Sequence, residues 1–455
     1  MNPPRSLRSL PPRGLVSRSG RPFPTDMRGR LNLFQAAMLR WRELYPYNAV
    51  HVAELPGPLD VARLTDAIAA HLTALGVTGL VLDTARRRFE YGGGPAHIVV
   101  DVLAGGPDAV GVLEREMERQ LNTAFARDGR LDPFRFFVLD AGGSFHLGVA
   151  YDHVIAGGDS IVGLLKGIAV RYAGGVAPAL PPPDLYPATY GRLFRRNAVK
   201  FYVGQYLLPA MLLRSRRAFR PRYRFGDGWY NAVTSLELPP PLYAAVLRTA
   251  KAWGVTLNDL LLAMLLTALA PEVPERLHAR RRNEIAVASV VNIRHELAAG
   301  PEAAFGQFLS SFLVSHPVPP GITLEALAHD IHAQTQRVKR RKLYLQTLYM
   351  IAWGGLVWPY LTPAQRTQMH AKNYPVWAGM TMLNVEAIWG DAPGDARVLH
   401  YLRAVSTGPF TPILMMPASV GDCLHIGVTY RTAAFNKENV ARISAKLIEC
   451  ARNLP

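Results

Sequence analysis

Residues 151–160 read YDHVIAGGDS, a stretch in which a strand, a glycine turn and a helix follow one another. Residues 144–153 alternate between two faces, as the side chains of a strand do. From 161 to 172 apolar residues recur at helical spacing, and Asp159 or Ser160 is suited to cap that helix. This order places a histidine at the end of a strand, directly before the turn.

Helices and strands are predicted throughout the chain, in an order that indicates an α+β fold. The helices are expected over residues 31–44, 59–75, 112–125, 256–269, 324–342, 343–358 and 437–452. The strands are expected over residues 48–54, 98–102, 134–139, 144–153, 284–292, 413–416 and 424–430. The sequence has no internal repeat with a period of roughly 20–50 residues, which argues against a solenoid or a propeller.

The positive charge of the chain is concentrated in two places. The 455 residues include 51 Lys and Arg against 34 Asp and Glu, a net charge of +17. Residues 1–30 carry seven Arg and one Asp, and residues 192–224 carry ten basic side chains and no acidic one. The rest of the chain is therefore nearly neutral. Basic regions of this kind bind nucleic acid, an anionic membrane surface, or acidic substrates and carriers.

Two basic regions adjoin apolar and aromatic sequence, which favours a membrane surface over nucleic acid. Residues 198–213 are largely apolar and lie between arginines, and the basic residues 337–342 precede the aromatic-rich stretch 343–361. We therefore predict contacts with an anionic membrane through 192–224 and 337–361. The alternative is that each helix packs its apolar face on the protein. Helix-turn-helix, zinc-finger and stacking-strand motifs are absent from the sequence, which argues against nucleic acid.

Cysteine spacing and apolar length indicate the compartment. Cys423 and Cys450 form neither a disulfide framework nor a zinc spacing, and His329 and His332 lack a third ligand, so no metal site is predicted. Residues 1–30 lack the apolar core of a secretory signal, and a transit peptide or an overextended start is the alternative for them. The longest apolar stretches are shorter than the roughly 20 residues that span a bilayer. We expect a cytoplasmic protein, peripheral at the inner face of the membrane.

Four segments in the same order resemble the condensation-domain and wax ester synthase-like acyltransferase superfamily. Residues 151–160 resemble its His-His-x-x-x-Asp-Gly motif, and 255–261, VTLNDLL, are similar to its Thr-x-Asn-Asp helix start. Residues 290–294, VVNIR, are similar to its Val-Asn-x-Arg strand end, and 305–308, FGQF, resemble its Gly-Asn segment. The resemblance implies two chloramphenicol acetyltransferase-like αβ sandwich subdomains that form a V-shaped pseudo-dimer, with the active site at their junction.

This resemblance divides the chain into four parts. Residues 1–30 are interpreted as a disordered basic tail and residues 31–185 as the N-terminal acyltransferase-like subdomain. Residues 186–230 are interpreted as a basic amphipathic connector and residues 231–455 as the C-terminal subdomain. Proline-rich sequence before the connector marks the first boundary.

The resemblance also assigns catalytic residues, although the motif departs from the usual pattern. His153 occupies the position of the catalytic histidine and is the predicted general base. Asp152 replaces the first histidine and is expected either to orient the imidazole or to cap the strand. Gly157 stands where the superfamily has an aspartate that pairs with an arginine. Asp159, two residues later, is expected to restore that pairing with Arg294.

Other residues are assigned to substrate binding and to support of the site. Substrate-binding roles are predicted for Gly157, Gly158, Ser160, Asn384 and Thr407, and structural support for Arg294 and Asn292. Amides of the glycine turn or the Ser160 hydroxyl are expected to stabilise an oxyanion. Asn384 and Thr407 are expected to line an acceptor tunnel, with roles in a turn and a strand as the alternative.

These residues favour acyl transfer, because attack on a thioester requires a base and imidazole titrates near neutral pH. We expect an acyltransferase that moves an acyl group from a CoA or carrier-protein thioester to a hydroxyl or amine acceptor, including lipid-like ones. Its partners would be acyl-CoA or an acyl carrier protein, with no permanently bound cofactor. The alternative is a catalytically inactive condensation-like protein that binds an acylated carrier or a membrane, which the glycine at 157 makes credible.

Overall fold

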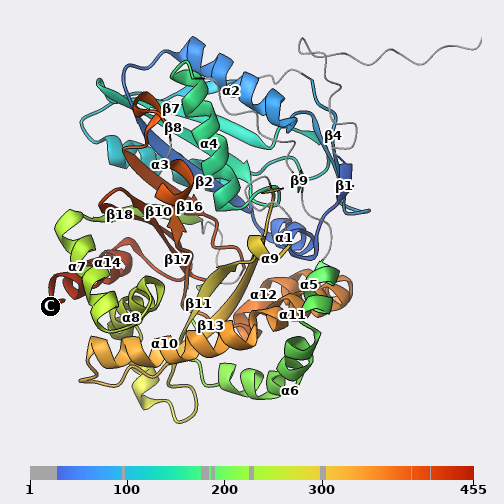
Figure 1. Cartoon of the computed structure of the whole chain (residues 1–455). Helices are drawn as coiled ribbons and strands as arrows, with labels where there is room; N and C mark the ends of the chain where they lie inside the picture. Colours follow the sequence, from blue (N-terminus) through green and yellow to red (C-terminus); the bar gives the residue numbers. More distant parts are fainter. Residues whose placement is uncertain are drawn as a thin grey trace, which may run out of the picture.

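The computed structural model describes most of the chain as two αβ halves (Figure 1). The described residues are 28–94, 98–175, 184–185, 190–224, 230–297, 304–390, 392–409 and 411–455. The predicted tail 1–30 lies outside them except for its last three residues. These form β1 (Arg28–Arg30), which pairs antiparallel with β4 (Arg88–Tyr91), so they belong to a sheet and not to the tail.

The N-terminal half is built on a five-stranded sheet with the order β16-β2-β8-β7-β5. Its strands are β2 (Asn48–Pro56), β5 (Val100–Val102), β7 (Phe134–Asp140), β8 (Ser144–Asp152) and β16 (His400–Val405). One face of the sheet packs on α3 (Ala109–Asn122), and the other on α2 (Val61–Leu75) and α4 (Gly158–Tyr172). Helix α1 (Leu33–Leu44) and a smaller sheet of β1, β4, β3 (Leu80–Asp83) and β6 (Gly129–Leu131) complete this half.

The C-terminal half is built on a seven-stranded sheet with the order β10-β18-β17-β14-β11-β13 and with β15 beside β17. Its strands are β10 (Asn231–Leu238), β11 (Ile285–Asn292), β13 (Leu309–His316), β14 (Ala378–Met380), β15 (Leu383–Asn384), β17 (Ile413–Val420) and β18 (Cys423–Arg431). The almost fully buried α8 (Leu257–Leu269) packs against α7 (Pro240–Ala252), α10 (Leu324–Arg341) and α14 (Lys437–Arg452).

Further helices lie between and beside the halves. They are α5 (Tyr190–Arg196), α6 (Ala198–Ser215), α9 (Arg294–Leu297), α11 (Tyr344–Val357), α12 (Pro363–Asn373) and α13 (Glu386–Trp389). The short strands β9 (Asp184–Leu185) and β12 (Ala304–Phe305) pair with each other. Within the described residues no single helix is long and apolar enough to cross a membrane. In the described part of the chain, one pair of helices, Pro240–Ala252 and Leu257–Glu272, bent by 110°, meets that test jointly.

Local signals explain which sequence predictions hold. The helix expected at 256–269 forms, with Thr256 and Asp259 as a capping box, and α14 has the predicted bounds. The helix expected at 112–125 begins three residues earlier, because the Asp108 side chain caps it. The N-cap of α4 is Gly157, without a side-chain hydrogen bond, so the expected cap at Asp159 or Ser160 is wrong.

Strand β16 is exchanged between the two halves. It comes from the C-terminal part of the chain, yet it pairs antiparallel with β2, from His400 opposite Glu54 to Val405 opposite Ala49. It also packs on β17 and β18, so it joins both sheets (Figure 1). A Cβ atom at Gly427 would lie 1.9 Å from the Arg403 carbonyl oxygen. Only glycine therefore allows this approach of the two backbones.

Replacement of Gly427 by alanine tests this contact. We expect Gly427→Ala to lower the free energy of unfolding by about 3 kcal/mol, because the added methyl group overlaps backbone that cannot rotate away. Urea denaturation measures the loss. The control is Gly163→Ala in α4, where the added Cβ meets open space and should raise stability by about 0.5–1 kcal/mol. Equal unfolding midpoints for Gly427→Ala and the wild type would contradict the close approach.

Candidate active site

His153 occupies the tight turn that connects β8 with α4. Its backbone N–H donates to the Tyr47 carbonyl oxygen at 3.0 Å, which fixes the turn to the start of β2. The imidazole is 7% exposed and lies between two aromatic rings, with centroid separations of 5.6 Å to Tyr47 and 5.8 Å to Tyr151. The predicted general base is therefore held by main-chain and ring contacts in a largely apolar setting.

Hydrogen bonds around Gln307 decide which nitrogen of His153 carries the proton. The Gln307 amide nitrogen donates to the carbonyl oxygens of His153, at 2.6 Å, and of Ala156. These two bonds use both amide hydrogens, although His153 Nδ1 also lies 3.0 Å from the same nitrogen. The Nδ1–H group therefore donates to the Ala156 carbonyl oxygen at 3.2 Å. Nε2 is left as the basic nitrogen, and none of the described residues hydrogen-bonds to it.

Burial keeps the His153 imidazole neutral. Desolvation lowers the pKa of His153 to about 4, with a smaller lowering from the Arg403 charge, although the Ala156 carbonyl oxygen acts in the opposite direction. At neutral pH the ring is consequently unprotonated, and Nε2 can accept a proton.

Gly157 and Gln307 are two departures from the motif that fit one another. The Gly157 amide donates to the Gly306 carbonyl oxygen at 2.9 Å, and a Cβ at 157 would lie 3.2 Å from Gln307 Oε1. A side chain at 157, such as the aspartate of the superfamily, would require this amide to shift. The Gln307 side chain fills that space and fixes the His153 turn itself.

The first turn of α4 is held by the end of β11 and the start of α9. Asp159 Oδ2 lies 3.7 Å from Arg294 Nε, as the predicted pairing requires, and the Asn292 amide also donates to Asp159. Arg294 donates to Ser160 Oγ at 2.7 Å, and so does the Gly306 amide at 3.2 Å. This network fixes the C-terminal half against the helix that follows His153.

These bonds bear on the oxyanion donors that the sequence suggests. The Gly157 amide and the Ser160 hydroxyl are both engaged, so neither is free to stabilise an oxyanion in this conformation. Gly158 is the first residue of α4, where the amide groups of a helix have no intrahelical partner and its dipole is positive. Of the three predicted oxyanion donors, the Gly158 amide is therefore the one that remains a candidate.

Asp152 belongs to a buried ion pair. Its carboxylate bonds the Arg42 guanidinium of α1 and accepts the Val154 amide at 3.2 Å, and both charged side chains are buried. Arg42 also donates to the Arg127 carbonyl oxygen. Burial raises the pKa of Asp152, and the Arg42 charge offsets part of this rise. These contacts anchor the end of β8 to α1. Of the two roles expected for Asp152, they correspond to the one at the end of the strand and not to orientation of the imidazole.

Asn384 and Thr407 make contacts typical of turns and strand ends. Asn384 Oδ1 accepts the Ala387 amide at 3.1 Å. The amide and hydroxyl of Thr407 both donate to Asn231 Oδ1, at 3.1 and 2.8 Å. Thr407 is nevertheless close to the site, because a Cβ at the next residue, Gly408, would lie 2.6 Å from the Tyr47 ring that flanks His153.

A second buried polar cluster lies against the start of α4, and the sequence analysis missed it. His51 Nδ1 lies 2.6 Å from the Tyr401 hydroxyl, and its Nε2 lies 3.3 Å from that of Tyr151. A Cβ at Gly158 would lie 3.5 Å from both Arg403 Nη1 and His51 Cε1. Burial lowers the pKa of Arg403 to about 10, so it remains a cation beside the turn. His51 in the apolar strand β2 and Arg403 in β16 are the signal that could have revealed this cluster.

An arginine-lined cavity adjoins the site on the side of α1. It has a volume of about 340 Å³ and lies between α1, the β3–β4 turn and the end of α11. Its basic side chains are Arg40, Arg42, Arg87 and Arg127. The pKa of Arg40 is lowered to about 10 by burial and by Arg87, which leaves it charged at neutral pH. Arg42 also bonds Asp152, so this one side chain connects the cavity with the end of β8.

Comparison with solved structures decides the fold. No family model and no curated protein sequence matches the chain. The first condensation domain of the calcium-dependent antibiotic synthetase is 18% identical, with a TM-score of 0.67 over 94% of this chain and 97% of that one. The chain has the condensation-domain fold. The prediction of an α+β protein with two chloramphenicol acetyltransferase-like halves is confirmed.

Two other solved structures, from proteins with different names, are also similar to this chain. Polyketide synthase associated protein 5 from Mycobacterium tuberculosis is 15% identical, with a TM-score of 0.62 over 95% of this chain and all of that one. The X-domain from teicoplanin biosynthesis is also 15% identical, with a TM-score of 0.59 over 95% and 97% of the two chains. At these identities the likeness shows the fold alone. The wax ester synthase part of the resemblance stays a prediction.

The buried histidines predict instability in acid. His153, whose folded-state pKa is about 4, binds a proton only in the unfolded state between pH 6.5 and 4. The free energy of unfolding should therefore fall as the pH is lowered through this range. When the pH is lowered to 4, the free energy of unfolding of His153→Gln should fall by about 3 kcal/mol less than that of the wild type. Urea denaturation at pH 7.5, 5.5 and 4 measures both proteins. Identical losses would contradict the lowered pKa.

Proposed function

We propose that the chain is an acyltransferase that moves an acyl group from a CoA or carrier-protein thioester to a hydroxyl or amine, with His153 as the general base. The orientation of His153 carries the proposal. Its Nδ1–H is held by the Ala156 carbonyl oxygen, and its neutral Nε2 is not hydrogen-bonded by any described residue. The condensation-domain fold supports the same class of reaction.

Proton transfer through His153 would link the attack of the acceptor with the departure of the thiol. Nε2 takes the proton of the acceptor hydroxyl or amine as its oxygen or nitrogen attacks the thioester carbonyl carbon. The new C–O or C–N bond forms, the C–S bond breaks, and the imidazolium returns the proton to the leaving thiolate. A histidine whose pKa is about 4 is neutral before the attack and, once protonated, gives the proton up readily. The Gly158 amide is our candidate to stabilise the oxyanion.

The arginine-lined cavity is our candidate for recognition of the donor. CoA and the phosphopantetheine arm of a carrier protein both bear phosphate, which arginine binds by paired charge-assisted hydrogen bonds. Arg42 is already paired with Asp152, but Arg40, Arg87 and Arg127 still supply more positive charge around about 340 Å³ than the single lining carboxylate, Glu43, can balance. Through Arg42, a phosphate bound there would also lie beside the anchor of the His153 turn.

Replacement of His153 tests the proposed role directly. We expect His153→Ala to lower the rate of acyl transfer by about 10²–10⁴, because the general base is lost, while the circular dichroism is unchanged. Mass spectrometry and thiol release follow acyl-CoA and acyl-carrier donors with lipid alcohols and amines as acceptors. His329→Ala, an exposed histidine on α10, is the matched control and should keep full activity.

Two results would contradict this assignment. Turnover retained by His153→Ala would remove the histidine from catalysis. Absence of thiol release by the wild type across all donors would favour the second candidate, an inactive condensation-like protein that binds an acylated carrier. Gly157 in place of the motif aspartate is the observation that favours this candidate.

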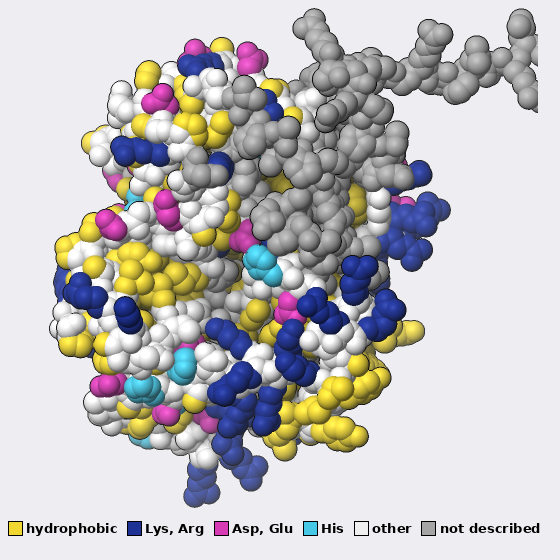
Figure 2. All heavy atoms as spheres, viewed as in Figure 1, with side chains coloured by type: hydrophobic (Ala, Val, Ile, Leu, Met, Phe, Trp, Pro, Cys, Tyr) yellow, Lys and Arg dark blue, Asp and Glu magenta, His cyan; other side chains and the backbone are white. Residues whose placement is uncertain are grey.

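We also propose that α6 and α11 hold the protein on an anionic membrane. The two helices pack together through Gln205 and Gln346, whose amides hydrogen-bond at 2.7 Å, and they leave large apolar side chains exposed. The exposed residues are Val199, Tyr202, Val203, Tyr206, Leu213, Met350, Trp353, Leu356 and Val357, with Tyr360 directly beyond α11. Figure 2 shows this apolar area at the lower right, next to many Lys and Arg side chains.

The exposed aromatic side chains and the adjacent basic side chains of this surface both suit a membrane interface. Tyr206 and Tyr360 are 87% and 86% exposed, so the helices do not use these rings to pack on the protein. Aromatic side chains enter the headgroup region, and each adjacent Lys or Arg adds about 1 kcal/mol on an anionic surface. We infer that an enzyme held on a bilayer by this surface would have access to lipid-like acceptors.

Vesicle binding tests the proposed surface. We expect the wild type to co-sediment with phosphatidylcholine vesicles that contain phosphatidylserine, and to dissociate at high salt, because the basic residues are then screened. The double variant Tyr206→Ser with Trp353→Ser should bind at least about tenfold more weakly, since it removes two interfacial rings. Leu277→Ser, at an exposed apolar residue outside α6 and α11, is the control. Absence of binding by the wild type even at low salt would reject the proposal.

A further inference from the structure

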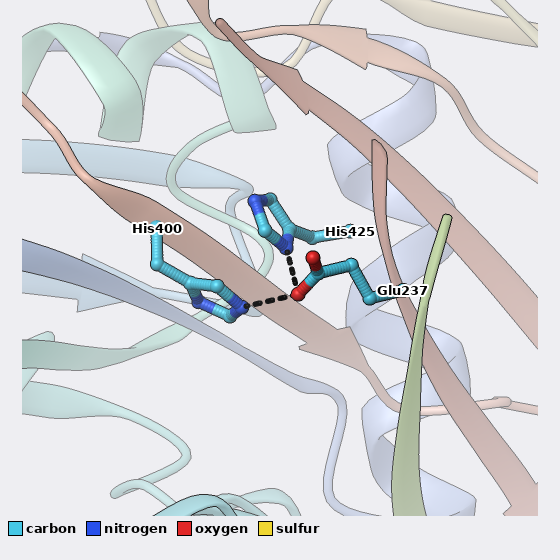
Figure 3. A group of neighbouring side chains, drawn as sticks. All are labelled: Glu237, His400 and His425. Carbon is cyan, nitrogen blue, oxygen red and sulfur yellow. Dashed lines mark ion pairs between the residues drawn. The ribbon is translucent and has the colours of Figure 1, made fainter. Parts of the chain in front are cut away.

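Two histidines and a glutamate meet where the sheets of the two halves pack on each other (Figure 3). Glu237 on β10 and His425 on β18 are cross-strand partners, and His400 comes from the exchanged strand β16. His425 Nδ1 lies 3.4 Å from Glu237 Oε2, and His400 Nε2 lies 3.8 Å from the same oxygen. The two imidazole rings are 3.8 Å apart between centroids.

The burial of His425 is unexplained by its protein contacts. The residue is 3% exposed, and neither of its ring nitrogens has a hydrogen-bond partner among the described residues. A buried imidazole without such bonds loses its hydration without compensation.

We propose that Glu237, His400 and His425 bind a divalent transition metal ion, with zinc as the best match. A tetrahedral zinc ion with bonds of about 2.0–2.1 Å holds its ligand atoms about 3.4 Å apart. The observed separations of 3.4 and 3.8 Å are close to this value, and one atom from each of the three side chains lies within 4.8 Å of the others. Two imidazoles and a carboxylate are a common zinc ligand set with one open position.

The fourth position of the tetrahedron is left for a water molecule. Cys423 precedes His425 by two residues on β18, but its sulfur is not among the ligand atoms that lie within 4.8 Å of one another. Three protein ligands with one open position are an arrangement that zinc accepts.

The surroundings of His400 resemble the outer shell of a metal ligand. His400, Glu54 and His146 are consecutive cross-strand partners on β16, β2 and β8. Glu54 lies directly opposite His400 on the neighbouring strand, and the Ser144 hydroxyl donates to its carboxylate at 2.6 Å. Carboxylates placed behind metal-binding histidines orient the ring and increase its basicity.

The ligands come from both halves of the molecule. His400 belongs to the five-stranded sheet, whereas Glu237 and His425 belong to the seven-stranded sheet. A bound ion would therefore cross-link the sheets at the exchanged strand, which also carries Arg403 beside the active site. The site is separate from His153 and requires no role in acyl transfer.

Zinc titration of the full-length chain tests the proposal. After treatment with a chelator, the wild type should bind one Zn²⁺ per chain in competition with a chromophoric chelator, and its thermal midpoint should rise with Zn²⁺. Glu237→Gln and His425→Ala should each weaken binding by more than about 100-fold, because even outer-shell partners contribute about 10–100-fold. His329→Ala should bind as the wild type does and controls for adventitious histidine binding.

The conservative variant keeps the test decisive. Glu237 is 45% exposed and glutamine has nearly the same shape, so Glu237→Gln should fold even where His425→Ala does not. Circular dichroism verifies the fold of each protein. Equal zinc affinities for the wild type and Glu237→Gln would overturn the proposal, and so would the absence of stoichiometric binding by the wild type.

Discussion

The pairing of β16 with β2 is the constraint on which the rest of the structure depends. A strand from the C-terminal half completes the N-terminal sheet, and its backbone touches Gly427 of β18 without a side chain between them. This close approach brings Tyr401 and Arg403 to the start of α4 and His400 to His425. Both polar centres between the halves therefore exist because one strand crosses from one sheet to the other.

The candidate active site shows how a variant motif can keep its geometry. The usual aspartate is replaced by Gly157, and the space is filled from the other half by Gln307, which satisfies two carbonyl oxygens of the His153 turn. Arg294 then bonds Asp159 and Ser160, both in the first turn of α4. Side chains from both halves thus hold the turn that carries His153.

Sequence reasoning succeeded where the determining interactions are local. The apolar spacing of α14 and the capping box of α8 lie within single segments, and these helices have nearly the predicted bounds. It failed where a partner is distant. The strand β16 was not predicted, because its pairing partner β2 lies more than three hundred residues away in the sequence. No spacing rule could unite Glu237, His400 and His425, which come from three separate strands.

By itself the sequence determined the class of fold, the position of His153 at a strand end and the two basic regions. These features follow from local periodicity, turn chemistry and charge, which a chain carries wherever it folds. Only the tertiary structure decided the rest. It set the tautomer of His153 through Gln307, the partner of Asp152, the neutral state of the buried histidines and the exposed face of α6 and α11. Burial and long-range contacts fix these properties, because desolvation and hydrogen-bond partners depend on what the distant parts of the chain bring together.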